Sequence, residues 1–176
     1  MSRCAVFIDG GYLNKILEHE FSRPLLDYGK LSQELAGDTE RLRTYYYHCM
    51  PYQGDPPTEE EKQRHANMAR FIEALKRLPR FEFRQGRLAK REGGFEQKRV
   101  DIWIAVDLVR LSFSHQITKA IIISGDSDLV PAIEAAKDAG VVVELWYSRR
   151  AVHNELLQAA DERFEITQSL IDKIRR

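Results

Sequence analysis

Short apolar runs alternate with longer amphipathic segments along the whole chain, and this succession predicts strands alternating with helices. Five runs predict strands, because each is apolar or alternates apolar with charged residues and is bounded by turn-forming residues. They lie at residues 5–8, 42–49, 81–83, 120–123 and 141–146. A further short edge strand is predicted at residues 164–167.

Amphipathic segments between these runs predict helices. Thr58 and Glu61 have the spacing of a capping box, which starts a helix that ends at about residue 78. Leu31 and Leu35 indicate another helix by their spacing. The remaining helices are predicted at residues 12–19, 100–113, 128–139, 151–160 and 168–176. Residues 90–97, which include two adjacent glycines, are expected to form a loop.

Strands that alternate with helices in pieces this short require βαβ crossovers and a parallel sheet covered on both faces. The expected fold class is therefore α/β: a three-layer α/β/α sandwich around a mainly parallel five-stranded sheet. Its first and fourth strands are expected to be neighbours, as in flavodoxin-like orders. Residues 1–176 are expected to form one domain, because this length suits one core rather than two.

Composition narrows the classes of function. Hydrophobic residues make up 43% and charged residues 31%, as in globular proteins. The 27 basic and 27 acidic residues cancel, so any attraction for nucleic acid must be local. Cys4 and Cys49 suggest neither a disulfide framework nor a CxxC metal site. No apolar run is long enough for a signal peptide or a membrane span, so we expect a cytoplasmic protein with no membrane partner.

Aspartates follow two of the predicted strands. Asp9 comes directly after the first, and Asp126 and Asp128 come after the fourth. Asp101 lies in the first turn of the helix that leads into the fourth strand. Because ligands bind at the carboxyl ends of parallel strands, we expect these side chains to converge. Clustered carboxylates resist joint ionisation unless a cation lies between them, and their oxygens suit Mg²⁺ or Mn²⁺. Such a cation assists hydrolysis of a phosphodiester.

A basic segment precedes this group. Residues 80–99 carry seven Lys or Arg against three Glu, and the aromatic residues among them are Phe81, Phe83 and Phe95. Basic side chains with interleaved aromatic rings suit a single-stranded nucleic acid. Lys98 and Arg99 stand directly before the helix of Asp101 and are expected to hold phosphates, together with Arg84. Ser124 is a further candidate for a phosphate hydrogen bond.

Each candidate also has an ordinary structural explanation. Asp9 and Asp126 could simply begin turns, Asp128 could cap a helix, and Asp101 could be a favourable charge in a first turn. Ser124 could be small for packing, and the basic segment could be a solvated loop. Asp107, about half a turn from the face of Asp101, is better explained as a solvated or paired residue.

Other chemistries lack their motifs. The five histidines have no HExxH or Cys/His spacing, which argues against zinc. The sequence contains no GxxxxGK[ST], GxGxxG or GxSxG, so nucleotide-cofactor and serine-hydrolase sites are not supported.

Three segments together resemble the NYN-domain family of LabA-like proteins, within the PIN-like nuclease superfamily. They are FIDGGYLN, KRVDIWIAVDLVR and IIISGDSDLVPAIEAAKDAGVVVELW. The order of elements matches from about residue 4 to 167. The resemblance implies a PIN-like fold and a metal-dependent ribonuclease whose acids align with Asp9, Asp101, Asp126 and Asp128. Family members commonly have Asn three positions after the first Asp, where this chain has Tyr12; Asn14 is the candidate replacement.

The predicted function is endonucleolytic hydrolysis of single-stranded RNA, with Mg²⁺ or Mn²⁺ bound by Asp9, Asp101 and Asp126, and Asp128 in support or on a second ion. One alternative is a non-catalytic module that binds RNA or a protein through the same acidic face. Another is a phosphotransfer or topoisomerase–primase-like site. Asp126 and Asp128 have the spacing of its DxD pair, but such a site requires Glu at the position where this chain has Asp9. A homodimer is left open.

Overall fold

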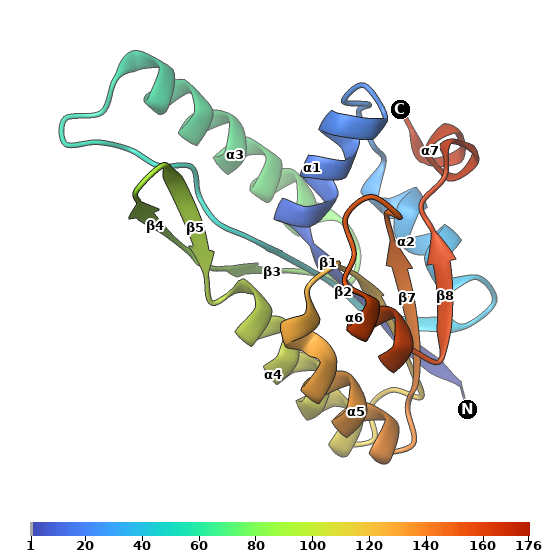
Figure 1. Ribbon diagram of the computed structural model, residues 1–176. Helices are drawn as coiled ribbons and strands as arrows, with labels where there is room; N and C mark the ends of the chain where they lie inside the picture. Colours follow the sequence, from blue (N-terminus) through green and yellow to red (C-terminus); the bar gives the residue numbers. More distant parts are fainter. Residues whose placement is uncertain (1) are drawn as a thin grey trace.

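A parallel sheet of six strands forms the centre of the protein. The computed structural model describes residues 2–176, and the sheet order is β3-β2-β1-β6-β7-β8 (Figure 1). Its strands are β1 (Arg3–Asp9), β2 (Glu40–His48), β3 (Phe81–Gln85), β6 (Lys119–Ile123), β7 (Val142–Tyr147) and β8 (Glu162–Glu165). Every neighbouring pair in this sheet is parallel.

The predicted α/β class is confirmed, but the strand count and order differ from the prediction. β8, expected only as a short edge strand, pairs with β7 and makes the sheet six-stranded. Counted along the chain, the main-sheet order is 3-2-1-4-5-6 rather than the flavodoxin-like 2-1-3-4-5. The predicted contact of the first and fourth strands is present, because Cys4–Ile8 of β1 pairs with Lys119–Ile123 of β6.

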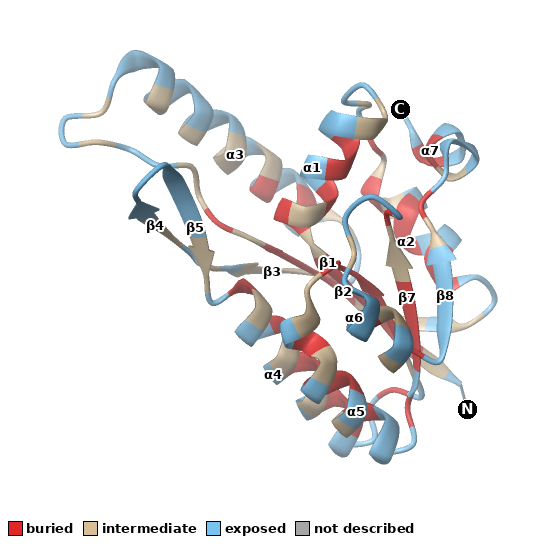
Figure 2. Cartoon of the chain, viewed as in Figure 1, coloured by how far each residue is buried: buried red, intermediate tan, exposed pale blue. Residues whose placement is uncertain are grey.

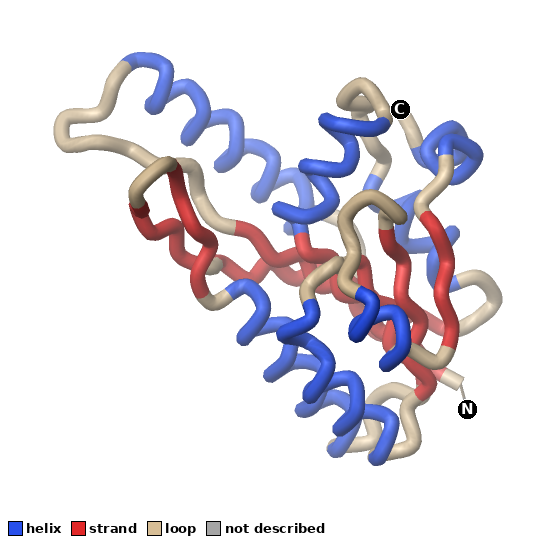
Figure 3. The backbone as a smooth tube through the Cα atoms, in the orientation of Figure 1, coloured by secondary structure: helices blue, strands red, loops and turns tan. Residues whose placement is uncertain are grey.

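Helices cover both faces of the sheet, which gives three layers (Figure 3). One face is covered by α1 (Gly10–Glu20), α2 (Tyr28–Ala36), α3 (Glu59–Arg77) and α7 (Gln168–Ile174). The other is covered by α4 (Val100–Phe113), α5 (Val130–Asp138) and α6 (Asn154–Ala159). Successive residues of β1 point to opposite layers, so Val6 and Phe7 are both fully buried in different cores. Buried positions accordingly line the inner side of each layer (Figure 2).

Helix starts follow the residues that the sequence indicates. Thr58 and Glu61 form the predicted capping box at α3. The helix predicted at residues 128–139 instead begins as a 3₁₀ turn, η1 (Ser127–Leu129), before α5. Pro131 has no N–H to donate to the carbonyl of Ser127, whereas the N–H of Val130 does bond it, so the first turn stays tight.

Residues 90–97, predicted as a loop, belong to an antiparallel hairpin. Its strands are β4 (Arg87–Arg91) and β5 (Gly94–Lys98), joined by a two-residue turn at Glu92 and Gly93. Gly93 has a φ of 81°, which glycine adopts without strain. Most residues of these strands are exposed and none is fully buried, so no apolar face indicated a strand. The hairpin lies next to the N-terminal end of α4 (Figure 1).

A buried carboxylate fixes α4 to the sheet. Asp107 is 1% exposed, and its Oδ2 accepts a hydrogen bond of 2.8 Å from the hydroxyl of Tyr47 in β2. The same carboxylate pairs with Arg84 of β3 at 3.2 Å and with Arg110 at 3.1 Å. Asp107 thus connects α4 to β2 and β3. The sequence had indicated a solvated or paired residue here rather than a metal ligand, and the structure shows these pairs.

Asp107→Ala should therefore lower stability without touching the strand ends. Loss of the carboxylate leaves Arg84 and the Tyr47 hydroxyl without their partner, at a cost of roughly 2–4 kcal/mol. The melting temperature should fall by several degrees. Asp138→Ala, an exposed aspartate at the end of α5, is the matched control and should melt like the wild type. Equal melting of the two variants would contradict the role of Asp107.

Candidate metal and nucleic-acid site

The candidate site lies between β1 and β6, where the order of the strands along the sheet reverses. The chain proceeds from β1 to β2 and β3 on one side, and from β6 to β7 and β8 on the other, so the loops after β1 and β6 diverge. Asp9 ends β1, and Asp126 follows β6 by three residues. The Oδ1 of Asp9 accepts a hydrogen bond from the N–H of Tyr12 at 3.1 Å, which caps α1. Asp9 is thus fixed at this edge of the sheet.

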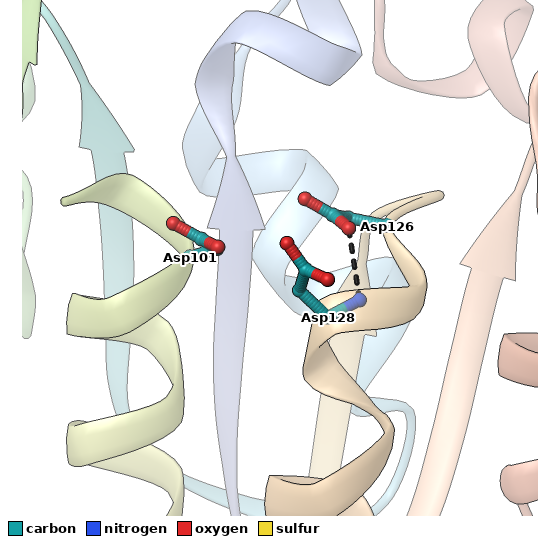
Figure 4. A group of neighbouring side chains, drawn as sticks. All are labelled: Asp101, Asp126 and Asp128. Atoms are coloured by element: carbon teal, nitrogen blue, oxygen red, sulfur yellow. Dashed lines mark hydrogen bonds between the residues drawn. The ribbon is translucent and has the colours of Figure 1, made fainter. Parts of the chain in front are cut away.

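Three carboxylates meet between α4 and η1. Asp101, Asp126 and Asp128 each offer one oxygen, and these oxygens lie within 4.8 Å of one another. They come from the first turn of α4, the loop after β6 and η1, and point toward the same space (Figure 4). The backbone N–H of Asp128 donates to Oδ1 of Asp126 at 2.9 Å, so one acid orients the other.

Asp9 lies beside this group but is not among its three members. Burial is the largest cause that raises the pKa of Asp9, and the nearby charges of Asp126 and Asp101 add to it. The backbone N–H groups of Tyr12 and Gly11 act in the opposite direction, and the net pKa is about 6. The three carboxylates that lie closest together are therefore not the predicted three. Asp128 was expected only in support but joins Asp101 and Asp126, whereas Asp9 lies beside them. The backbone after β6 explains this, because η1 turns Asp128 back toward Asp126.

Two adjoining pockets open over the acids. The first, about 420 Å³, contains all four aspartates and also the predicted phosphate-binding residues Lys98 and Arg99. The second, about 600 Å³, shares Asp9 and Asp126 with the first and extends along α1 and the loop after β7. Arg99, the residue directly before α4, has a φ of 74°, an unfavourable backbone conformation for a residue with a side chain. Acidic and basic groups thus line two adjoining pockets that share residues.

The residues present suit a hard divalent cation. Mg²⁺ and Mn²⁺ prefer carboxylate oxygens and keep open positions for water or phosphate oxygens. Three carboxylate oxygens within 4.8 Å, with a fourth carboxylate held partly buried beside them, repel one another unless a cation lies among them. A cysteine or histidine donor is absent from this three-carboxylate group.

Three of the predicted substrate-binding residues do not line either pocket. Arg84 is paired with Asp107 and lies over the rings of Tyr45 and Trp103. Ser124 is fully buried, and its hydroxyl accepts a hydrogen bond from the N–H of Asp126. Their side chains are used inside the fold, so they position elements of the site rather than face its solvent.

Asn14 is the third predicted residue that lines neither pocket. Its amide is 3.2 Å from Nε2 of His48, and both residues line a separate pocket with α3. Tyr12, at the position where the resemblance expects Asn, has a structural role. Its hydroxyl donates to the carbonyl of Ala151 at 2.6 Å and accepts from the N–H of Ser148 at 3.0 Å, which ties α1 to the loop after β7.

The hairpin supplies site residues that the sequence did not indicate. Glu96 and Gln97 of β5 line both pockets, and Phe95, which the basic segment had indicated, lines the second. Lys15 of α1, also missed from the sequence, lines the second pocket too. Gln97 lies directly against Gly11, where a Cβ atom would collide with its amide. The sequence feature that could have predicted this hairpin is Glu92–Gly93, a pair of residues that suits a two-residue turn between two strands.

The comparisons with known proteins agree with this geometry. The family model described as the NYN domain matches residues 3–168. The chain belongs to the NYN domain family. The NYN domain is a PIN-like, nuclease-type domain, so the acidic group occupies the scaffold of a nuclease.

A solved structure shares the fold of this NYN domain. It is the crystal structure of a protein of unknown function from Vibrio parahaemolyticus RIMD 2210633, with a TM-score of 0.67 and 17% sequence identity. The similarity covers 99% of this chain and 96% of that one. At this identity the similarity shows the fold alone. No curated protein matches the sequence. Among residues 2–176 no helix combines the length and apolarity that crossing a membrane requires.

Asp9→Asn tests the electrostatic strain at the site. Because the pKa of Asp9 is raised in the folded state, the folded protein holds this proton more tightly than the unfolded chain does. The free energy of unfolding therefore decreases as the pH rises from about 4 to about 6, and this loss remains at neutral pH. Asparagine keeps the cap of α1 and removes the charge. In EDTA at neutral pH, Asp9→Asn should raise the melting temperature by a few degrees, and Mn²⁺ should stabilise it less than it stabilises the wild type.

Thermal unfolding with EDTA and with Mn²⁺ measures both effects. Asp138→Asn, distant from the pockets, should respond to Mn²⁺ as the wild type does. An identical response to Mn²⁺ in Asp9→Asn would remove Asp9 from the metal site.

Proposed function

We propose that this NYN domain is a divalent-metal-dependent endoribonuclease acting on single-stranded RNA. The observation that carries the proposal is the convergence of Asp101, Asp126 and Asp128 at the carboxyl edge of a nuclease-type fold. These three carboxylates would hold Mg²⁺ or Mn²⁺, with Asp9 beside them. The bound cation would supply charge neutralisation at the scissile phosphate and a water of lowered pKa.

The side chains of the pocket have separate tasks in this reaction. Asp126 is held by Ser124 and Asp128, so its oxygens keep their direction while substrate exchanges. Lys98 and Arg99 lie at the rim of the pocket with the acids and would bind the phosphates on either side of the cut. Lys15 lines the adjoining pocket and would hold a phosphate further along the strand. Arg84, paired with Asp107, has no part in this.

Two exposed aromatic rings favour a single strand as substrate. Tyr52 and Phe95 lie with ring centroids 4.9 Å apart and are 37% and 51% exposed. Lys90 places its ammonium 5.8 Å from the ring of Tyr52. Phe95 also lines the second pocket with Asp9 and Asp126. An unpaired base could stack on this aromatic pair while its phosphate lies over the acids, whereas a base inside a duplex could not.

Cleavage of labelled single-stranded RNA tests the proposal. The wild type should cut with Mn²⁺ or Mg²⁺ and not with EDTA, and both Asp101→Asn and Asp126→Asn should lower the rate by roughly 100-fold or more, because each removes a charge that stabilises the transition state. Asp138→Asn should cut at the wild-type rate. Full activity in Asp101→Asn, with normal folding by circular dichroism, would overturn the assignment.

Failure to cut by the wild type has its own interpretation. If the protein binds single-stranded RNA and Mn²⁺ without cleavage, the same face serves as a binding module. A parallel series with single-stranded DNA of the same sequence determines whether the 2′-hydroxyl contributes to recognition.

Phe95→Ala and Tyr52→Ala test the aromatic pair. Each should weaken binding of single-stranded RNA by roughly 10-fold, since stacking of one base contributes about 1–3 kcal/mol. Phe164→Ala is a matched control. Phe164 lies on the edge strand β8, at the opposite end of the sheet from β3, and is 37% exposed. Its ring also stacks on another aromatic ring, that of Trp146, with centroids 4.9 Å apart. Fluorescence anisotropy with EDTA measures binding without cleavage. Equal losses in all three variants would show that the aromatic pair has no special role.

A further inference from the structure

The outer ridge of α4 is apolar although it faces solvent. Ile102, Val106 and Phe113 are 62%, 48% and 55% exposed, and Val109 between them is partly exposed. The inward face of the same helix carries the core residues Ile104, Leu108 and Leu111, which are fully buried. Figure 2 shows exposed and buried positions following each other along α4. The helix is therefore apolar on two opposite faces, yet the sheet covers only one.

The ridge has the spacing of a helix–helix seam. Ile102, Val106, Val109 and Phe113 are separated by four, three and four residues, the pattern of alternating a and d positions in a heptad. They form one line about 16 Å long on the helix surface. Surface helices normally carry charged residues there, as α5 does with Glu134, Lys137 and Asp138. Isolated exposed apolar residues are ordinary, but a continuous line of them indicates an interface.

We propose that a second copy of this chain covers this ridge, with the two α4 helices packed antiparallel about a twofold axis. The spacing is symmetric about the middle of the helix, so an antiparallel copy brings Ile102 against the partner's Phe113 and Val106 against the partner's Val109. A twofold interface must be self-complementary in this way. None of the four residues carries a charge, so pairing two copies brings no like charges together along the seam.

The bordering residues suit the same occupant. Trp103, 38% exposed, and Arg110 lie on one side of the ridge, and the charge of Arg110 is already paired with Asp107. Tryptophan and arginine are enriched at the energetic centres of protein interfaces. The exposed apolar area of the ridge with Trp103 is on the order of 400 Å² per protomer, which places the interface among the small ones. The dimer should therefore be weak and form with rising concentration in the micromolar range.

The dimer would border the acidic pocket without adding a group to it. Ile102 lines the pocket that contains Asp101 and also begins the ridge. The partner's Phe113 would cover its outer surface and limit the mobility of this rim. The inference concerns assembly alone and does not depend on nuclease activity.

Sedimentation velocity over a concentration series tests the proposal. The wild type should change from monomer to dimer as its concentration rises, and Val106→Lys or Val109→Glu should each weaken the dimer by at least about 10-fold, because a charge would be buried in an apolar seam. An equimolar mixture of the two variants should recover a dimer, since the antiparallel register places position 106 of one copy against position 109 of the other.

The matched control is Val142→Lys, a valine of β7 that is 40% exposed and away from α4. It should dimerise like the wild type, and Val142→Lys and Val106→Lys should keep the wild-type melting temperature at low concentration, since exposed substitutions change stability little. Val109 is partly buried and packs against the core, so Val109→Glu should lower the melting temperature and is compared at a temperature where circular dichroism shows it folded. A wild type that stays monomeric throughout, or a dimer unaffected by both substitutions, would overturn the proposal. Failure of the mixture to recover a dimer would overturn the antiparallel pairing.

Discussion

Repulsion among four carboxylates is the constraint around which this end of the molecule is organised. Asp9 and Asp126 are brought together by the pairing of β1 with β6, and Asp101 and Asp128 come from helix starts on either side. Burial and the neighbouring charges together raise the pKa of Asp9 to about 6, so this arrangement costs free energy at neutral pH. The surrounding structure has to hold the acids in place without relieving the repulsion, and a divalent cation bound as proposed would relieve it.

Contacts among the elements around the acids hold them in place. Asp107, buried beneath α4, connects the helix to β2 and β3 through Tyr47 and Arg84, which keeps the first turn of α4 in position. The hydroxyl of Tyr12 joins α1 to the loop after β7, and Gly125 has no side chain where Tyr12 and the Ala151 carbonyl approach it. A site that must keep like charges close depends on supports of this kind, because flexible loops would let the carboxylates separate.

The sequence was informative wherever a local pattern determined the outcome. The buried strands that precede Asp126 and end at Asp9 were predictable from apolar runs and turn residues, and α3 from its capping box. Side-chain partners far apart in sequence were not. Arg84 looked like a phosphate ligand because it lies in a basic segment, and only the fold shows that β3 brings it to Asp107. The hairpin of residues 87–98 was missed because it packs little apolar surface, so its strands carry no hydrophobic alternation.

Helix α4 shows how one segment can meet several demands at once. Its first turn presents Asp101 to the pocket, its inner face packs on the sheet, and its buried Asp107 anchors neighbouring strands. None of these contacts involves the outer ridge, and an exposed helix face normally carries charged or polar residues. Apolar residues at a regular four-three-four spacing therefore need a reason outside the isolated chain. A covered α4 would also be a stiffer α4, and the geometry of the carboxylates depends directly on where that helix begins.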